Sequence, residues 1–219
     1  MDKTDFYKVL DAAPMVPVFY CADVPTACGV LRACYEGGVR VFEFTNRGPA
    51  AEEVFAALVP FAAKELPGLL LGAGSVSDAR AARRFLRLGA QFIVGPQYVP
   101  AVRRVCRLRG IPYVPGCGTV SEVGRAQRAG CPVTKVFPGE VLGPAFVKAL
   151  LAPMPWSRIM VTGGVEPTQE NLEAWFGAGA VSVGMGSNLL SKDLLAAADW
   201  PALTARCRDC FTIISKVKR

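Results

Sequence analysis

The sequence CPVTKVFPGE occupies residues 131–140 and contains a short apolar run, 133–137, that predicts a β-strand. A proline and a glycine end this run. Gly130, just before it, is typical of a helix C-terminal cap, and the amphipathic segment 143–151 after it predicts a helix. This order of glycine, short strand and helix recurs along the whole chain.

Eight apolar runs predict strands, at 15–20, 39–44, 69–73, 92–95, 112–115, 133–137, 159–162 and 181–184. Helices are predicted at 3–12, 23–36, 49–63, 77–88, 98–108, 119–129, 143–151, 168–177 and 199–216. Eight strands that are each followed by a helix predict an α/β protein, a (β/α)₈ TIM barrel with an extra N-terminal helix. No low-complexity linker divides residues 1–219, so we expect one domain. A doubly wound open sheet fits less well, because no GxGxxG motif opens the first βα turn.

Composition limits the classes of function. The 219 residues are 52% hydrophobic and carry a net charge of +7. No apolar run reaches the length of about 20 residues that spans a bilayer, and the N-terminus lacks an apolar signal core. We therefore expect a cytoplasmic protein without a membrane partner. The arginines cluster at helical spacing without interleaved aromatic residues, so no nucleic-acid partner is expected, only a mild attraction for anionic substrates.

The chain contains no histidine, which excludes Ser-His-Asp and Cys-His catalysis and histidine-ligated zinc. Eight cysteines are scattered along it, and the CxxC formed by Cys207 and Cys210 has no second pair. We expect neither a disulfide framework nor a bound metal. Proton transfer must then use carboxylates, lysine, tyrosine, cysteine or water.

Lys135 is the most informative residue. Side chains alternate along a strand, so Lys135 faces the same way as Val133 and Phe137. If that face is the core, burial lowers the pKa of the amine, and a neutral amine can attack a ketone to form a Schiff base. The alternative is a lysine at a strand end whose ammonium extends to solvent.

Polar residues at other strand ends complete a candidate site, because chemistry in barrels gathers at the C-terminal ends of strands. Glu43 shares the inward face of the second strand and is a candidate acid/base; the alternative is a salt bridge to a neighbouring cation. Arg47 follows in the loop and could hold a carboxylate. Ser75, after two glycines, could donate a hydrogen bond, although a plain turn would look similar.

The last two strands end in glycine-rich turns, VTGGV and VGMGSN. Barrels commonly bind phosphate at these two loops, and exposed backbone N–H groups favour an anion. The candidate phosphate-binding residues are Gly163, Gly164, Gly184, Gly186 and Ser187. Tight turns without a ligand are the alternative. Thr162 could bind a substrate hydroxyl, Phe137 could pack on a planar ligand, and Pro96 belongs to a rim of low polarity that helps to keep the amine neutral.

Together these segments resemble the family of 2-keto-3-deoxy-6-phosphogluconate (KDPG) and 4-hydroxy-2-oxoglutarate (KHG) aldolases. The segments that carry the resemblance are GGVRVFEFTNRG (37–48), LGAGSV (71–76), GAQFIVGP (89–96), PYVPGCGTVSE (112–122), TKVFPGE (134–140), VTGGV (161–165) and GMGS (184–187). The resemblance runs across nearly the whole chain and implies a class I, Schiff-base aldolase on a (β/α)₈ barrel, typically a homotrimer without a cofactor.

The resemblance also implies roles for individual residues. Lys135 takes the place of the Schiff-base lysine and Glu43 that of the general acid/base. Arg47 and Ser75 fall where the family holds the substrate carboxylate, and Ser75 replaces a threonine found in many members. Phe137 would pack near the pyruvyl group. Thr162 falls on the family's strand-seven threonine, and the glycines and Ser187 fall on its phosphate side.

Asn46, Gly95 and Gly139 depart from residues common in the family, and they put substrate preference in doubt. The implied reaction cleaves KDPG to pyruvate and glyceraldehyde 3-phosphate, as in the Entner–Doudoroff pathway of carbohydrate metabolism. Rival readings are cleavage of KHG to pyruvate and glyoxylate, an aldolase for a galactonate-series phosphosugar, and a non-catalytic barrel that binds a phospholigand. The sequence leaves the stereochemistry at C4 open, and also whether Cys117 touches substrate.

Overall fold

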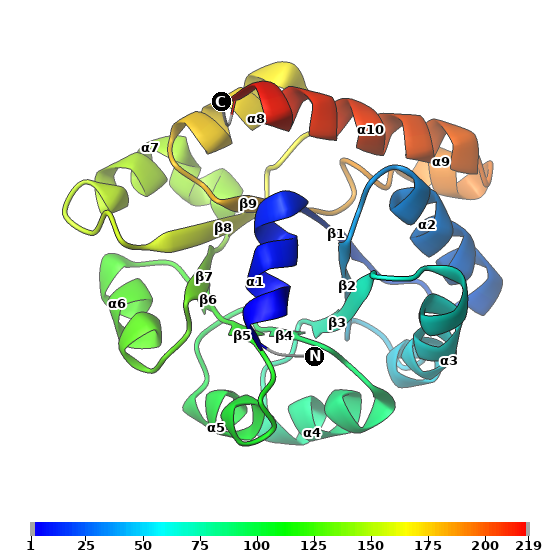
Figure 1. Cartoon of the computed structure of the whole chain (residues 1–219), viewed down its shortest axis with the longest axis horizontal. Helices are drawn as coiled ribbons and strands as arrows, with labels where there is room; N and C mark the ends of the chain where they lie inside the picture. The colour runs from blue at the N-terminus through cyan, green and yellow to red at the C-terminus, as the bar shows by residue number, and fades with distance from the viewer. Residues whose placement is uncertain (1–2, 218–219) are drawn as a thin grey trace.

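The computed structural model describes residues 3–217, which form a parallel β-barrel inside a ring of helices (Figure 1). The strands are Met15–Phe19 (β1), Val41–Thr45 (β2), Leu70–Gly74 (β3), Ile93–Val94 (β4), Tyr113–Val114 (β5), Gly116–Cys117 (β6), Val133–Val136 (β7), Arg158–Thr162 (β8) and Ser182–Met185 (β9). Their order in the sheet is β5-β4-β3-β2-β1-β9-β8-β7-β6, and every neighbouring pair is parallel. The predicted (β/α)₈ barrel is confirmed.

The barrel closes at Pro115, because the predicted strand 112–115 is shortened to β5 and a further strand, β6, which was not predicted, follows the proline. Tyr113–Val114 pairs with β4, and Gly116–Cys117 pairs with β7. Proline has no N–H to donate to a ladder, but the Pro115 carbonyl accepts a hydrogen bond of 2.8 Å from the Lys135 amide. The chain therefore changes its neighbouring strand at Pro115, from β4 to β7. β5 and β6 together take the place of one strand in the eight-stranded barrel.

The helices are Lys3–Ala12 (α1), Val24–Glu36 (α2), Ala51–Glu65 (α3), Ala79–Leu88 (α4), Pro100–Leu108 (α5), Val120–Arg128 (α6), Gly139–Leu151 (α7), Gln169–Gly177 (α8), Lys192–Ala196 (α9) and Trp200–Val217 (α10). Five of them begin at a side-chain cap, since Asp23, Asp78, Thr119, Thr168 and Asp199 each accept a hydrogen bond from the first turn. Among the described helices none is long and apolar enough to cross a membrane.

Most predicted boundaries shift by one or two residues; two of the shifts have a clear cause, and one short helix was not predicted. The second strand begins at Val41 and not at residue 39, because the Val39 amide still bonds to the Cys34 carbonyl at the end of α2. α7 begins at Gly139 and not at residue 143, and a left-handed Gly143 (φ 71°) breaks its first turns. The short α9 was not predicted, because its five residues are too few for a periodic pattern.

Two apolar layers fix the barrel. The outer layer lies between strands and helices, and the inner layer fills the barrel near the N-terminal ends of the strands. Phe6 and Leu10 of α1 belong to the inner layer, so α1 lies across this mouth of the barrel (Figure 1). Val41 and Val133 are also in the inner layer. Because side chains alternate along a strand, Glu43 and Lys135 point to the inside, one step closer to the open mouth.

Candidate active site

Lys135 and Glu43 lie on strands at opposite sides of the barrel. Lys135 is on β7 and Glu43 on β2, with β1, β9 and β8 between them along one side of the sheet. Both are buried, at 4% and 2% exposure. The Lys135 ammonium does not extend to solvent, which removes that alternative for this residue. The Lys135 Nζ lies 5.0 Å from the centre of the Phe137 ring, on the face that alternation predicts.

Burial favours the neutral forms of both Lys135 and Glu43. It lowers the pKa of Lys135, although the carboxylate of Glu43 opposes the shift, and Arg47 lowers it further. It raises the pKa of Glu43, against the attraction of Lys135 and Arg47. The neutral form of the pair, an amine with a carboxylic acid, carries the same number of protons as the charged form, an ammonium with a carboxylate. The two forms differ only in which group holds the proton. Desolvation therefore favours moving the proton from Lys135 to Glu43, which leaves a nucleophilic amine beside a proton donor.

The Glu43 carboxylate packs against backbone and keeps one oxygen free. A Cβ built on Gly74 would stand 1.8 Å from Glu43 Oε1, so this position on β3 requires glycine. Oε2 is buried and has no hydrogen-bond partner within residues 3–217. A salt bridge to a neighbouring cation, the other reading of Glu43, is not formed among those residues. The free oxygen is available for a proton on a bound ligand.

A cavity of about 350 Å³ opens at the C-terminal mouth. It is lined by Val18, Arg47, Phe137, Glu140, Thr162, Gly163, Gly164, Val165, Gly184, Gly186, Ser187 and Asn188. All five residues predicted to bind phosphate are in this lining, together with three of those predicted to bind substrate. The Thr162 hydroxyl is buried and without a partner among the described residues, so it too can bond to a ligand.

The two glycine-rich loops are held together by amide side chains. Asn188 Nδ2 donates to the Val165 carbonyl at 3.0 Å, and Asn171 Nδ2 donates to the Gly164 carbonyl at 3.1 Å. Gly163 and Gly164 have φ of 98° and 67°, in the left-handed region that favours glycine. These bonds occupy loop carbonyls, whose negative ends would repel an anion, and they fix the backbone around the cavity.

Arg47 and Ser75 meet at the rim. The Arg47 guanidinium donates from Nε to the Ser75 hydroxyl at 3.2 Å, and Arg47 is exposed and lines the cavity. Ser75 has φ of 56°, an uncommon value for a residue with a side chain. The bond leaves the outer N–H groups of the guanidinium available for a carboxylate.

Five predicted or open positions are not in the lining of this cavity: Lys135, Glu43, Ser75, Pro96 and Cys117. Pro96 does not line it; its carbonyl lies against Gly116, where an added Cβ would stand 2.0 Å from that oxygen. Cys117 is buried and also absent from the lining, and its thiol faces the Pro115 carbonyl at 3.9 Å. Burial raises the pKa of Cys117 to about 12. The structure therefore favours a space-filling Cys117 over one that touches substrate.

Four lining residues, Glu140, Val18, Val165 and Asn188, were not predicted from the sequence. Glu140 follows the lysine strand directly, and its Oε2 lies 1.9 Å from the position of a Cβ on Gly163. Its place in the FPGE segment next to the strand end was the signal that could have identified it. Val18 is apolar and Asn188 lies in a turn, so neither residue type indicated a site.

The fold and this pair of groups define a class, barrel enzymes whose chemistry is at the C-terminal mouth. Residues 7–206 match the family described as KDPG and KHG aldolase. The chain is 32% identical to the 2-dehydro-3-deoxy-phosphogluconate aldolase of Treponema pallidum (strain Nichols) over 209 residues, 95% of this chain and 97% of the relative. It is 31% identical to the KHG/KDPG aldolase of Escherichia coli (strain K12) over 208 residues, 94% and 95% of the two chains.

Among solved structures, KDPG aldolase from Legionella pneumophila, with pyruvate captured as a covalent carbinolamine intermediate, superposes with a TM-score of 0.82. It is 25% identical, and the match covers 91% of this chain and 95% of that one. The chain belongs to the KDPG and KHG aldolase family. It is accordingly an aldehyde-lyase.

Proposed function

We propose that this protein is a class I aldolase that cleaves KDPG to pyruvate and glyceraldehyde 3-phosphate through a Schiff base on Lys135. One observation carries the proposal: a lysine 4% exposed, with its pKa lowered by burial, faces the interior of a barrel that also buries Glu43. A purely binding barrel has no use for a desolvated amine, which costs stability.

The first step is imine formation. The substrate carboxylate bonds to Arg47 and Ser75, which brings the C2 ketone to the mouth of the barrel. The lone pair of the Lys135 amine attacks C2 and forms a C–N bond, while the π electron pair of the ketone moves to its oxygen, which then takes a proton from the new ammonium. The resulting C2 hydroxyl takes a proton, for which protonated Glu43 is the donor, and leaves as water. The product is an iminium, a cationic centre that can accept an electron pair.

The second step is cleavage. Glu43, now a carboxylate, removes the proton from the C4 hydroxyl, directly or through a water molecule. The C3–C4 bond breaks, its electron pair moves to the iminium, and C4 becomes the aldehyde carbon of glyceraldehyde 3-phosphate. The enamine that remains on Lys135 takes a proton at C3, and water then hydrolyses the iminium to release pyruvate and restore the amine.

The phosphate end of the substrate is assigned to the glycine-lined side of the cavity. Gly163, Gly164 and Gly186 supply backbone, and Ser187 supplies a hydroxyl. Thr162 is assigned to a substrate hydroxyl, because its Oγ1 is buried and unpaired among the described residues. Phe137 forms the apolar wall beside the pyruvyl carbons. KHG is a second substrate candidate, since the Escherichia coli relative carries both names; it has no phosphate.

Trapping with pyruvate tests the imine. The protein is incubated with pyruvate and borohydride, digested, and mapped by mass spectrometry. We expect a reduced pyruvate adduct on Lys135 and none on Lys148, an exposed lysine of α7 that serves as the internal control. Lys135→Arg should lose both the adduct and aldol cleavage, because a guanidinium stays protonated. No adduct on folded protein would reject the class I mechanism and favour the binding barrel.

The aldehyde partner is tested separately. We expect kcat/KM for KDPG to exceed that for KHG if the phosphate cavity contributes to binding. Comparison of KDPG with its C4 epimer of the galactonate series assigns the stereochemistry. Equal kcat/KM for KDPG and KHG would remove the role given to the phosphate side.

We further propose that residues 1–219 act as one domain, in the cytoplasm, as a homotrimer serving the Entner–Doudoroff pathway. The trimer rests on the resemblance to the KDPG and KHG aldolase family, whose members are typically trimeric. Light scattering during size-exclusion chromatography tests it. We expect about three times the chain mass of 23.3 kDa, and a mass equal to that of one chain would contradict the trimer.

A further inference from the structure

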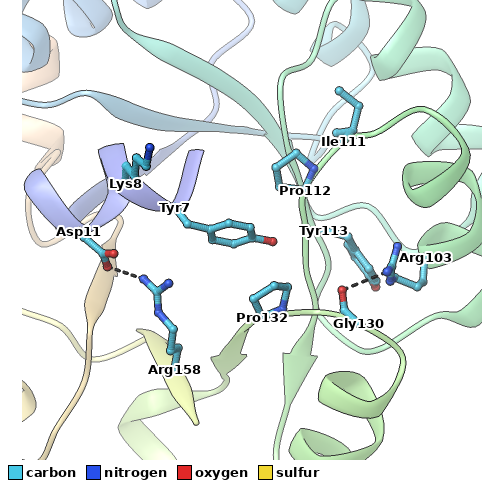
Figure 2. A pocket seen from close by; sticks show the side chains of 10 residues that line it. All are labelled: Tyr7, Lys8, Asp11, Arg103, Ile111, Pro112, Tyr113, Gly130, Pro132 and Arg158. Carbon is cyan, nitrogen blue, oxygen red and sulfur yellow. Dashed lines mark hydrogen bonds and ion pairs between the residues drawn. The ribbon is translucent and has the colours of Figure 1, made fainter. Parts of the chain in front are cut away.

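A second cavity, of about 380 Å³ (Figure 2), lies at the N-terminal end of the barrel, opposite to the proposed active site. It is formed where α1 crosses the N-terminal mouth. Its lining comes from α1, α5, the start of β8 and the loops that precede β5 and β7, and consists of Tyr7, Lys8, Asp11, Arg103, Ile111, Pro112, Tyr113, Gly130, Pro132 and Arg158. The aldolase mechanism uses none of these residues.

Positive charge predominates in this cavity. Three cationic side chains, Lys8, Arg103 and Arg158, line it together with one carboxylate, Asp11. Asp11 is already paired with Arg158, as the dashed line in Figure 2 shows. Within residues 3–217, Lys8 and Arg103 have no carboxylate within ion-pair distance. The cavity therefore retains two uncompensated positive charges, which favour a ligand with two negative charges.

Arg103 is held rigidly and keeps donors free. Its Nε donates to the Ala129 carbonyl at 2.8 Å and one terminal nitrogen donates to the Gly130 carbonyl at 3.0 Å. A guanidinium has five N–H donors, so these two bonds fix its orientation without exhausting it. Arg158 is fixed in a similar way by Asp11 and by the Tyr7 ring, 5.8 Å from its central carbon. Such pre-oriented cations bind an anion without a large loss of side-chain entropy.

The Tyr7 hydroxyl adds a neutral donor. Figure 2 shows its ring extending from α1 toward the prolines at positions 112 and 132, with the hydroxyl at the tip. It makes no hydrogen bond to another described residue. Burial raises the pKa of Tyr7 to about 12, so the group remains a protonated donor at neutral pH. By contrast, the Tyr113 hydroxyl is occupied, because it donates to the Gln97 carbonyl at 2.8 Å.

The cavity continues toward a neighbouring hollow of about 540 Å³. The two share Gly130, Pro132 and Arg158, and the second contains Met154 and Trp156, which is 69% exposed. A ligand with its charged groups near Arg103 and Arg158 would therefore have apolar surface beside it for a carbon skeleton.

We propose that this cavity is a second ligand site, separate from the active site, that binds a small organic dianion through Lys8, Arg103, Arg158 and the Tyr7 hydroxyl. Two kinds of metabolite share this chemistry, phosphate monoesters and dicarboxylates. The site does not depend on the aldolase assignment, because it shares no residue with the cavity at the other mouth.

Nuclear magnetic resonance can test the site residue by residue on the full-length protein. The signals to follow are the Nε–H groups of Arg103 and Arg158 and the amide of Gly130. Glycerol 2-phosphate and succinate are titrated in separate experiments, with acetate at matched ionic strength as the monoanion control. We expect saturable shifts at these three groups with at least one dianion, and not with acetate. The more tightly bound probe identifies the source of the ligand.

Variants separate this site from the phosphate side of the active site. Lys8→Met and Tyr7→Phe should each weaken binding about 3- to 10-fold, the scale of one charge or one hydrogen bond near a surface. Lys148→Met, which removes an exposed lysine on α7, should leave binding unchanged, and so should Ser187→Ala at the other mouth. Pyruvate trapping should proceed normally in the Lys8 and Tyr7 variants. Absence of saturable shifts, or equal binding in all four variants, would overturn the proposal.

Discussion

The Glu43 carboxylate occupies the space that a side chain on Gly74 would need. Oε1 of Glu43 lies 1.8 Å from the position of a Cβ on Gly74, and Gly74 pairs with Thr45 in the register between β2 and β3. The absence of a side chain on one strand thus permits the orientation of the acid on its neighbour. A substitution at Gly74 can therefore test the role of Glu43 without changing Glu43 itself.

Gly74→Ala should displace the Glu43 carboxylate and lower kcat by about 100-fold, the cost of a misplacement of about 1 Å. Gly177→Ala is the matched control, because a Cβ there meets no atom within 4 Å. Steady-state kinetics of KDPG cleavage checks the effect, and circular dichroism verifies that both variants fold. A Gly74→Ala enzyme with the kcat of the unmodified protein would show that the position of Glu43 is unimportant.

Glu43→Gln should slow cleavage by roughly 10² to 10⁴-fold, the usual contribution of acid/base help. Pyruvate should still be trapped on Lys135, more slowly. The charged Glu43 carboxylate raises the pKa of Lys135, so its removal lowers that pKa, and the pH dependence of trapping should move to lower pH. Trapping rates measured across pH provide the check. A shift to higher pH would contradict the electrostatic coupling.

Lys135→Met should reveal the charge state of the buried pair. If burial leaves an amine beside a carboxylic acid, replacement by an apolar side chain of similar length should raise the free energy of unfolding by about 1–3 kcal/mol, because a buried polar group is removed. If the pair is an ammonium and a carboxylate, the variant should instead lose about 3–5 kcal/mol, because Glu43 is left charged and alone. Chemical denaturation distinguishes the two, with Lys148→Met as the control for loss of an exposed lysine.

The difference in free energy of unfolding between Lys135→Met and the unmodified protein should change with pH in a defined direction. The pKa of Lys135 is lowered in the folded state, so folding disfavours its protonated form; the unmodified protein loses stability as pH falls below about 10.4, and this loss is complete once pH is below the folded-state pKa. The advantage of Lys135→Met should be greatest below that value. It should shrink as pH rises toward about 10.4, the pKa of an unfolded lysine. An advantage that grows with pH would contradict the lowered pKa.

Glu140→Gln should improve the use of phosphorylated substrate. The Glu140 carboxylate projects into the proposed phosphate cavity beside Gly163. Two charges about 4 Å apart interact by about 1 kcal/mol in water, so its removal should lower KM for KDPG by about 2- to 5-fold. KM for KHG, which has no phosphate, should not change. An equal effect on both substrates would place the influence of Glu140 elsewhere than on the phosphate.

The strand positions and the facing of Lys135 and Glu43 were predictable because both depend on local periodicity. A buried parallel strand reads as an apolar run, and alternation then places Lys135 on the same face as Val133. The change of partners at Pro115 was not predictable, because a local pattern does not specify which neighbour each amide bonds to. Pro96 illustrates the same limit: its position after a strand was correct, but its carbonyl lies against Gly116 outside the cavity. Glu140 was missed because the helix was predicted to begin at residue 143, so the place of Glu140 in the first turn of α7, beside Gly163, was not foreseen.

Within the described residues, α1 covers the N-terminal mouth of the barrel, and the cavity of the proposed active site opens at the C-terminal mouth. Phe6 and Leu10 seal one end with apolar side chains, so substrate, both products and the water that ends the cycle must pass through the other. In the proposed mechanism the outer loops bind the phosphate of the aldehyde, so the aldehyde lies between Lys135 and the C-terminal mouth. It would then leave before bulk water reaches the carbon still attached to the lysine. Coverage of the other end of the barrel by α1 thus predicts an order of product release, with the phosphorylated fragment first and pyruvate second.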